Sequence, residues 1–326
     1  NRCEEARVSE IREWTTTQRW LYAIKPASWP KLLVPMALGQ ALGIAVSGQI
    51  SMLALLLGVL FTLCDGLFIV LLNDWGDERV DRIKRDLFPQ GCSPKTIPDG
   101  VLPAHHLLVA GLVAGLGALM IGAIATTALG LTYGLLGAGC CLGLFVAYSL
   151  PPFELNDRGG GELLEMLGVG VALPLFNAYL QSGTLWDPRY ELLAGYALLS
   201  MGSALASGLA DEVSDHQGGK RTFTTMFGNR RVRTAVEVCL GLGGLAWWIA
   251  RWRHGAVIPW IAVAGANAAV VYYQWQLLEM THRAKTNAWD ALKLYKLHLH
   301  RGIWYAGLVM TTGLLLHALW LAGGAL

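Results

Sequence analysis

The amino-acid sequence predicts an all-α, polytopic membrane protein. The chain has 326 residues, of which 54% are hydrophobic and only 15% are charged, and its mean hydropathy is +0.44. An ordinary soluble protein is less apolar and carries more charge. The apolar residues are also grouped into runs that are long enough to cross a bilayer as helices. We therefore expect one transmembrane domain that spans residues 1–326.

Nine apolar runs are expected to form transmembrane helices, after a charged amphipathic stretch at residues 1–25. In that stretch Val8, Ile11 and Trp14 lie at helical spacing, which is typical of an interfacial helix. A cleavable signal is not expected, because the charged part is long and no small-residue cleavage site follows an isolated apolar core. The helices are expected, within a few residues at each end, at 29–47, 52–74, 105–125, 129–149, 163–181, 190–210, 232–250, 256–279 and 302–323.

The distribution of positive charge predicts the orientation. If the amino terminus is cytoplasmic, 22 of the 25 Lys and Arg residues fall on the cytoplasmic side, and only Arg189, Arg251 and Arg253 fall opposite. Cytoplasmic loops normally carry such an excess. The sequence thus predicts that the amino terminus and the 75–104 and 211–231 loops are cytoplasmic, with the carboxyl terminus on the other side.

Charge and cysteine content exclude other classes of protein. The net charge is +2 and no basic block is long, which argues against a nucleic-acid partner. The six cysteines show no metal-ligand spacing, and four of them lie in apolar runs, so we expect them to act as small hydrophobic residues.

An acidic cluster follows the second apolar run, where the sequence reads NDWGDERVD at residues 73–81. Acidic side chains at the end of a membrane helix are costly and often indicate a functional site. If the helix continues, Asn73, Asp77 and Asp81 fall at i, i+4 and i+8, which stacks their side chains roughly 6 Å apart on one face. Hard oxygen ligands in such an array suit Mg²⁺, which is often shared between carboxylates and a substrate phosphate.

A second acidic cluster follows the sixth run and reads DEVSDHQGGKRT at residues 211–222. Asp211 and Asp215 repeat the four-residue spacing, and two such faces turned toward each other would hold a diphosphate through bridging metal ions. Among the nearby cations, Lys95 and Lys220 are the better candidates for diphosphate contacts, because turn residues beside them would fold them over the site. Most of the other cations are explained by lipid headgroups and the positive-inside rule.

One further acid, Asp65, lies deep in the second apolar run with no cation near it in sequence. Two interpretations stay open: a protonated packing acid, or a group that lines a polar cavity.

These motifs carry a family resemblance. The two acidic clusters fit NDxxDxxxD and DxxxDxxxGKxT, and they are accompanied by YSLPPFELNDRGGGE at residues 148–162, KPASWP at 25–30 and KTIPDG at 95–100. With these motifs in this order, nearly the whole chain resembles the UbiA-type intramembrane prenyltransferases. Residues 173–183 are similar to the menaquinone-forming branch. The chain departs from the family pattern in four places, which are Lys95 in place of arginine, Asn156 in place of lysine, and Ser207 and Gly219 at positions that are acidic in some members.

The resemblance implies a nine-helix bundle around an apolar cavity, and it implies a reaction. That reaction is the Mg²⁺-dependent transfer of a prenyl group from an isoprenoid diphosphate to a small aromatic acceptor of quinone or meroterpenoid type, with release of diphosphate. The metal ligands that it implies are Asn73, Asp77, Asp81, Asp211 and Asp215. The diphosphate contacts are Lys25, Lys95, Lys220 and Arg221, and the catalytic residues near the reacting carbon or leaving group are Tyr148, Arg158 and Lys95.

Three alternatives accompany these expectations. The same scaffold would suit an intramembrane terpene cyclase, which needs no acceptor. A divalent-cation transporter is disfavoured because a transport path places acids near the bilayer midplane, whereas both clusters here lie at one face. Finally, Arg158 would only fix its loop if it pairs with a nearby acid such as Glu154, Asp157 or Glu162.

Overall fold

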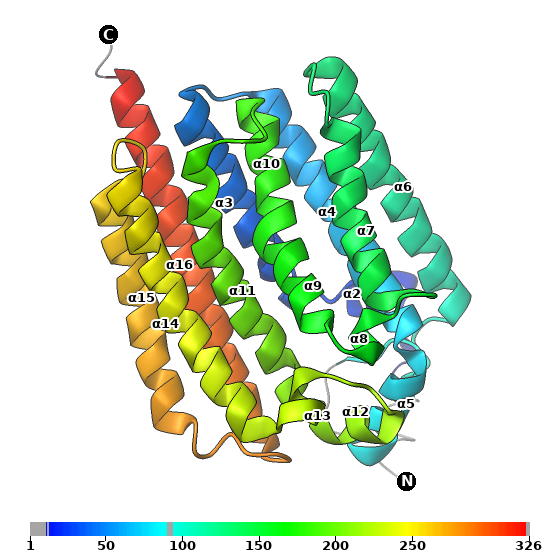
Figure 1. Ribbon diagram of the computed structural model, residues 1–326. Helices are drawn as coiled ribbons and strands as arrows, with labels where there is room; N and C mark the ends of the chain where they lie inside the picture. Colours follow the sequence, from blue (N-terminus) through cyan, green and yellow to red (C-terminus); the bar gives the residue numbers. More distant parts are fainter. Residues whose placement is uncertain (1–10, 12, 90–93, 324–326) are drawn as a thin grey trace.

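The computed structural model describes residues 11, 13–89 and 94–323, and the described chain is helical without any strand (Figure 1). This confirms the all-α prediction. The long helical segments are α3 (Pro30–Ser47), α4 (Met52–Gly76), α6 (Ala104–Ala128), α7 (Gly134–Ser149), α9 (Gly161–Leu167) with the π-helical η2 (Gly168–Ala172) and α10 (Leu173–Ser182), η3 (Pro188–Glu191) with α11 (Leu192–Leu209), α14 (Asn229–Arg253), α15 (Trp260–Met280) and α16 (Trp289–Gly323). The short elements are α2 (Thr16–Ile24), η1 (Pro26–Ser28), α5 (Glu78–Leu87), α8 (Leu155–Arg158), α12 (Glu212–Gly218) and α13 (Phe223–Phe227).

Each of the nine apolar runs is helical. Within the described residues, 7 helical segments are long and apolar enough to cross a membrane, namely α3, α4, α6, α9 through α10, η3 with α11, α14 and α16. The two other runs correspond to α7, a shorter apolar helix, and to α15. The number of nine crossings therefore stays a prediction, while the helical nature of every run is confirmed.

The largest error in the predicted boundaries is at α16, which begins at Trp289 and not near residue 302. Its first turns contain Lys and His residues, so hydropathy alone excludes them. They are nevertheless helical because Leu292, Tyr295 and Leu299 form a buried stripe at helical spacing. Helix α7 starts later than predicted, at Gly134, after a turn in which Gly130 has φ +67°.

The helices pack side by side into a bundle (Figure 1). Helices α3, α11, α14, α15 and α16 share one hydrophobic core, and α4, α6, α7 and α10 share another. At the contact of α3 with α10 the backbones approach closely, since a Cβ on Gly39 would lie 2.1 Å from the Pro174 carbonyl oxygen. Large hydrophobic side chains are exposed on the outside of the bundle, such as Leu116, Met120 and Ile124 on α6, which suits contact with lipid.

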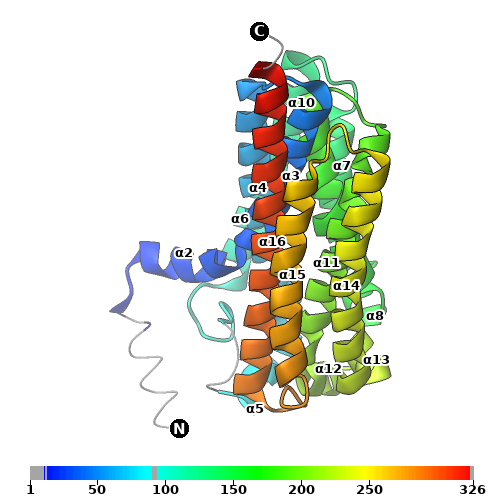
Figure 2. The same ribbon diagram turned by 90° about the vertical axis from the view of Figure 1, so that its left-hand side faces the viewer.

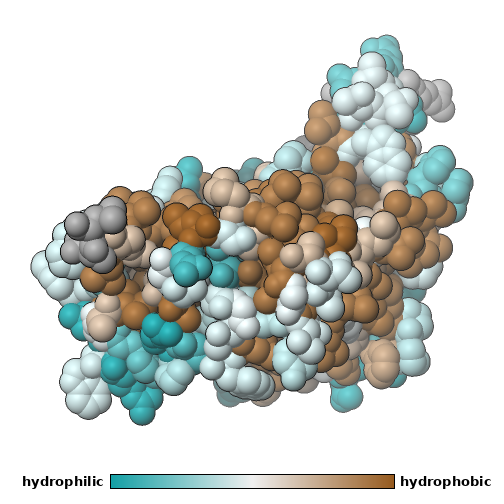
Figure 3. Space-filling view, turned by 90° about the horizontal axis from the view of Figure 1, so that it is seen from above, coloured by the Kyte–Doolittle hydropathy of each residue, from teal (hydrophilic) through white to brown (hydrophobic). Residues whose placement is uncertain are grey.

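The two ends of the bundle differ. Both acid-bearing helices, α5 and α12, lie at the end shown at the bottom of Figure 1, and α16 finishes at the opposite end. Viewed from that opposite end, the surface is largely hydrophobic with separate hydrophilic patches (Figure 3). Helix α2 lies across the bundle direction and projects from its side (Figure 2). Its role as an interfacial helix stays a prediction, and Val8 lies outside the described residues.

Candidate active site

A cavity of about 340 Å³ opens between the acid-bearing helices and extends into the bundle. Its charged and polar lining is Lys25, Lys31, Asp65, Asn73, Asp74, Asp77, Asp81, Lys84, Lys95, Tyr148, Glu162, Glu165, Asp211, Asp215 and Lys220, among others. Its apolar lining includes Leu32, Ile69, Val70, Val80, Cys141, Leu144, Phe145, Leu164, Val169, Leu173 and Ala204. The five predicted metal ligands thus share one cavity, and so do three of the four predicted diphosphate contacts.

The first acidic cluster spans the junction of α4 and α5. Helix α4 ends at Gly76, close to the expected end at residue 74, and Asp77 has φ −84° and ψ 4°, so one uninterrupted helix through the cluster is not formed. The interruption is one residue long, because the amides of Asp77 and Asp81 still donate to the carbonyls of Asn73 and Asp77, each at 2.9 Å. The three side chains therefore still face one cavity, and the Asn73 amide donates to the Asp77 carboxylate at 3.0 Å.

The second cluster spans the junction of α11 and α12. Helix α11 ends at Leu209, Asp211 is the N-cap residue of α12, and the Asp215 amide donates to the Asp211 carbonyl at 2.8 Å. Helix α12 packs directly against α5, where the Arg79 guanidinium donates to the Gly218 carbonyl at 2.8 Å. These contacts bring the two clusters to the same mouth of the cavity.

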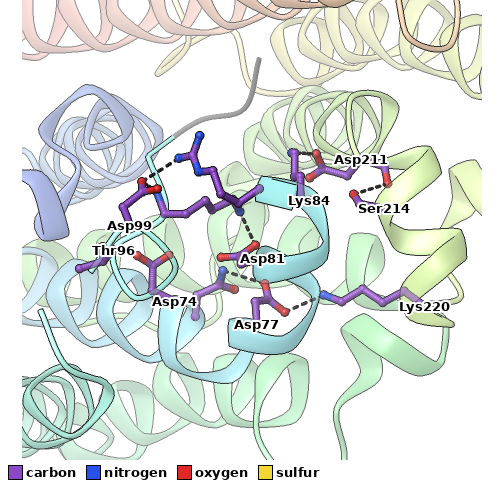
Figure 4. Close-up of polar contacts among 12 residues, drawn as sticks. Asp74, Asp77, Asp81, Lys84, Thr96, Asp99, Asp211, Ser214 and Lys220 are labelled. Atoms are coloured by element: carbon purple, nitrogen blue, oxygen red, sulfur yellow. Dashed lines mark hydrogen bonds and ion pairs between the residues drawn. The ribbon is translucent and has the colours of Figure 1, made fainter. Parts of the chain in front are cut away.

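Lysines from each cluster bind aspartates of the other cluster (Figure 4). Lys220, which follows α12, donates to Asp77 at 2.6 Å and pairs with Asp157 at 3.0 Å. In the reverse direction, Lys84 of α5 pairs with Asp211. The two clusters are therefore joined by reciprocal ion pairs.

Two more lysines reach the first cluster from other parts of the chain. Lys95, in the loop after α5, pairs with Asp81, and Lys25, in the link from α2 to α3, pairs with Asp74. Lys25 has a left-handed backbone with φ 47°, and this directs the chain into η1. Four lysines and the acids that they contact thus form the mouth of the cavity.

The charged groups at the mouth change one another's pKa values. Burial alone would lower the pKa of Lys220, but the adjacent Asp77 and Asp157 more than offset it, so that the pKa is raised and the lysine stays charged. Burial also raises the pKa of Asp215 to about 6, although Lys220 and Lys84 act in the opposite direction. A site with this much positive charge held among carboxylates suits an anionic ligand together with a cation.

Sequence reasoning missed Asp74 and Lys84. Asp74 is 2% exposed and accepts a hydrogen bond from Thr96 at 2.6 Å as well as the contact from Lys25. It lies beside Asn73 in the sequence, but only the fold shows that it ties two distant segments together. Lys84 could have been found from its spacing, because it lies one turn beyond Asp81 and two turns beyond Asp77.

The loop that carries Lys95 is fixed by a buried acid, Asp99. Its carboxylate accepts from Arg85 at 2.7 Å, from the Tyr22 hydroxyl at 2.6 Å and from the Lys95 amide at 3.1 Å. Burial and the adjacent Asp99 raise the pKa of Tyr22, so its hydroxyl stays protonated and donates. Asp99 therefore connects α2, α5 and the loop, and positions the Lys95 side chain at the mouth.

The remaining predicted residues are placed differently. Tyr148, on α7, lines the cavity as expected. Arg158 does not line it, and its guanidinium instead pairs with Glu154 at 3.0 Å with more than half of its side chain exposed. Arg221 is exposed as well, and its backbone amide donates to the Asp157 carbonyl at 2.8 Å. Both arginines flank the mouth, and their roles stay predictions.

The described residues contain no preformed group of three or more His, Cys, Asp or Glu side chains close enough to hold a metal ion. The oxygen donors instead lie apart around the cavity, with lysines among them. Asp65 also lines the cavity, which agrees with the second of the two interpretations of that acid.

Comparison with known proteins gives a family and a fold. A model of the UbiA prenyltransferase family matches residues 32–297, which is well over half of the chain. A search of curated proteins gave no significant match.

Several solved structures are similar to this one. A UbiA homolog from Archaeoglobus fulgidus bound to DMAPP and Mg²⁺ has 15% identity and a TM-score of 0.66, with 90% of this chain and 99% of that chain covered. The apo UbiA homolog from Aeropyrum pernix K1 has 14% identity and a TM-score of 0.62, covering 83% and 96%. A digeranylgeranylglyceryl phosphate synthase has 14% identity and a TM-score of 0.60, covering 92% and 98%. At such identities the likeness concerns the fold.

Proposed function

Because this chain belongs to the UbiA prenyltransferase family, and is therefore a multi-pass membrane prenyltransferase, we propose that it prenylates a small aromatic acceptor. The donor is an isoprenoid diphosphate, and diphosphate is released. The observation that carries this proposal is the cavity that joins a mouth of lysines and carboxylates to an apolar interior. The mouth suits the diphosphate, and the interior suits the prenyl chain and an aromatic ring.

The lysines at the mouth bind the diphosphate in this proposal. Lys220 is 7% exposed and held charged by Asp77, so its ammonium group is already desolvated and oriented before substrate enters. Lys95 and Lys25 approach the same space from two other segments. Three cations from separate parts of the chain therefore surround the space at the mouth, where the charge of a leaving diphosphate would develop.

The donor set fits Mg²⁺. Four carboxylates and one amide line a single cavity, and hard oxygen ligands shared with a phosphate are what Mg²⁺ prefers. The ion pairs do not exhaust these oxygens, since a carboxylate offers about four acceptor sites and Asp77 uses one contact on each oxygen, to Lys220 and Asn73. Asn73, Asp77, Asp81, Asp211 and Asp215 would hold the metal. Bound there, Mg²⁺ would neutralise charge that grows on the departing diphosphate.

The transfer breaks the allylic C–O bond, and the bonding electrons leave with the diphosphate. A carbon of the aromatic ring then forms a C–C bond to the allylic carbon, and the ring loses its proton. Leu144, Phe145 and Val169 line the interior and exclude water that would quench the allylic cation. Tyr148 lies on the same wall, one turn beyond Leu144 and nearer to the acids, and it would face the reacting carbon with its electron-rich ring.

Arg158 and Arg221 do not bind the diphosphate directly in this proposal, unlike the lysines. Both are exposed beside the mouth and add positive charge where the substrate enters. We expect them to attract the diphosphate during association, which is an effect that salt screens.

The two alternative functions, a cation transporter and a terpene cyclase, are not equally supported. A divalent-cation transporter is not supported, because the chain belongs to a family of prenyltransferases. A terpene cyclase uses the same mouth and the same apolar interior, so the dependence on an acceptor separates it from a transferase.

Product analysis tests the proposal. Purified protein is given a panel of prenyl diphosphates with Mg²⁺, in the presence and absence of hydroxylated benzenes and naphthalenes, and the products are identified by mass spectrometry. We expect prenylated aromatic products and diphosphate release that depends on the acceptor. Full turnover to cyclised hydrocarbon without any aromatic compound would replace the transferase by a cyclase.

We also propose that the amino terminus and the acid-bearing loops face the cytoplasm, with the carboxyl terminus opposite. The support is the 22 positive charges counted on that side of the sequence and the position of α5 and α12 at one end of the bundle. Single cysteines replacing the exposed Asp86 and Gln217, in a background without native cysteines, should react with an impermeant reagent only from the cytoplasmic side. A cysteine replacing Gln49, at the other end, should react only from the opposite side.

A further inference from the structure

Asp65 is an acid in the middle of a membrane-spanning helix, and it faces the cavity. It lies in α4, eight residues before Asn73, which places it about 12 Å deeper along the helix axis. Ile69 lies between them on the same cavity-facing stripe. Asp65 is therefore well separated from the mouth, where the lysines are.

No partner inside the described protein accounts for this carboxyl group. The side chain is 3% exposed, and its Oδ1 atom is fully buried without a hydrogen-bond partner among the described residues. None of the ion pairs found in the described chain includes Asp65. Because an unsatisfied buried polar group is costly, retaining one beside a cavity points to a partner that enters the cavity.

The surroundings narrow the chemistry of that partner. Leu32 lies beside α4 at Gly66, and Cys141 of α7 lines the same cavity as Asp65. Neither supplies a positive charge that would balance a second anion. A carboxylate or a phosphate would be repelled here, whereas a hydroxyl group donates a hydrogen bond to a carboxylate and also pairs with a carboxylic acid.

We propose that the Asp65 carboxyl group hydrogen-bonds a hydroxyl group of the aromatic acceptor, and thereby selects hydroxylated rings over their ethers. This inference rests on the proposed transferase function and specifies its second substrate. The diphosphate is held at the mouth and the acceptor hydroxyl lies deeper, so the ring lies between them with its carbon edge toward the allylic carbon. Asp65 is thus a specificity-determining residue on the side of the cavity away from the leaving group.

The test uses purified full-length protein with Mg²⁺, a saturating prenyl diphosphate, and mono- and dihydroxylated benzenes and naphthalenes, each paired with its methyl ether. In the wild-type protein we expect the hydroxylated member of the productive pair to be preferred on the order of 10-fold or more in kcat/KM. Asp65→Leu should raise the KM for that acceptor on the order of 10-fold and remove the preference over the ether. The KM for the prenyl diphosphate should change less than about twofold, because the mouth is untouched.

Two further variants keep the test interpretable. Asp65→Asn retains size and hydrogen-bonding capacity, so it should fold even if Asp65→Leu does not, and it should show a smaller rise in the acceptor KM. Thr62→Val is the matched control, because Thr62 is also buried in α4 but donates to the Gly58 carbonyl at 2.8 Å and does not line the cavity. Its acceptor KM should match that of the wild type.

The inference is overturned if the wild type prenylates hydroxylated rings and their ethers equally, or if both Asp65 variants keep the wild-type acceptor KM. In those cases transfer to an aromatic ring still occurs, so the proposed function survives. If the wild type forms no acceptor-dependent product at all, the proposed function fails and this inference fails with it.

Discussion

The two acidic segments, which are the first cluster together with α5 and the second cluster, share the four-residue spacing of their aspartates but are held differently by the fold. In the first, Asp74 and Asp81 are 2% and 5% exposed, and they are bound by Lys25 and Lys95 from other parts of the chain. In the second, the Asp211 side chain is 33% exposed, and its lysine partner, Lys84, belongs to the first segment. The first segment is therefore held by lysines from two other parts of the chain, whereas the second is held by the first segment and by the short helix that contains Asp157.

The reciprocal pairs show why neither segment would suffice alone. Lys220 of the second segment neutralises Asp77 of the first, and Lys84 of the first pairs with Asp211 of the second. A diphosphate that enters this mouth meets charges from both segments at once. Variants of the two segments distinguish one shared site from two independent sites.

The largest effect should come from removing one aspartate of either segment. Asp77→Ala and Asp211→Ala should each lower kcat/KM on the order of 100- to 1,000-fold, because each removes a preorganised charge from the shared mouth. Steady-state kinetics of folded, detergent-purified protein over a range of Mg²⁺ concentrations measures the loss. Asp86→Ala is the matched control, since Asp86 is an exposed acid of α5 outside the cavity. Near-normal turnover by either active-site variant would show that the two segments do not share a site.

A smaller effect is expected from the lysines that cross between the segments. Lys220→Met and Lys84→Met should each lower kcat/KM roughly 10- to 100-fold, the range for losing hydrogen bonds to a charged group. Lys220→Met should be the more severe, because Lys220 contacts both Asp77 and Asp157. A Lys84→Met variant that matches the wild type in both activity and prenyl-diphosphate KM would contradict a functional role for the reciprocal ion pairs.

The anchoring of the first segment predicts a change in stability. Asp74→Asn leaves the Lys25 ammonium without its carboxylate and weakens the contact to Thr96, so the free energy of unfolding should fall by about 3 kcal/mol. Thermal unfolding in detergent should show a lower midpoint for Asp74→Asn than for Asp77→Asn, since the Asp77 side chain is more exposed than that of Asp74. Equal midpoints for these two variants would argue against the anchoring role of Asp74.

The smallest effect is expected for the exposed arginines. Arg158→Ala and Arg221→Ala should raise the KM for the prenyl diphosphate by less than about threefold at low salt, and by less still at high salt, because exposed charges are screened. Kinetics at two ionic strengths measures this difference. A loss of kcat that salt does not change would instead mean that the arginine contacts the reacting groups, as the sequence motif implies.

Much of the fold could be predicted because it depends on local hydropathy. Every apolar run is a helix, and the acids of both clusters face one cavity, as their four-residue spacing indicated. Prediction failed where tertiary packing overrides hydropathy. The first turns of α16 are polar but helical because one stripe is buried.

The candidate site could be predicted less completely, since its ion pairs join residues far apart in the sequence. The pairing of Lys25 with Asp74 spans 49 positions and that of Lys220 with Asp77 spans 143, and no local pattern specifies either one. Arg158 differs, because its pairing with Glu154 was one of the alternatives that the sequence left open, although its position outside the cavity was not predicted. Its partner Glu154 is local, and the exposure of the pair depends on how the loop folds.

The central claim is that both segments form one Mg²⁺-dependent diphosphate site, and equilibrium binding of an unreactive prenyl thiolodiphosphate tests it most directly. Isothermal titration of the wild type should show one molecule bound per chain with Mg²⁺, and binding weakened at least about 10-fold when the metal is chelated. Asp77→Ala and Asp211→Ala should each abolish the Mg²⁺-dependent part. Binding that is unchanged by chelation, or that survives in either variant with its Mg²⁺ dependence intact, would contradict the claim.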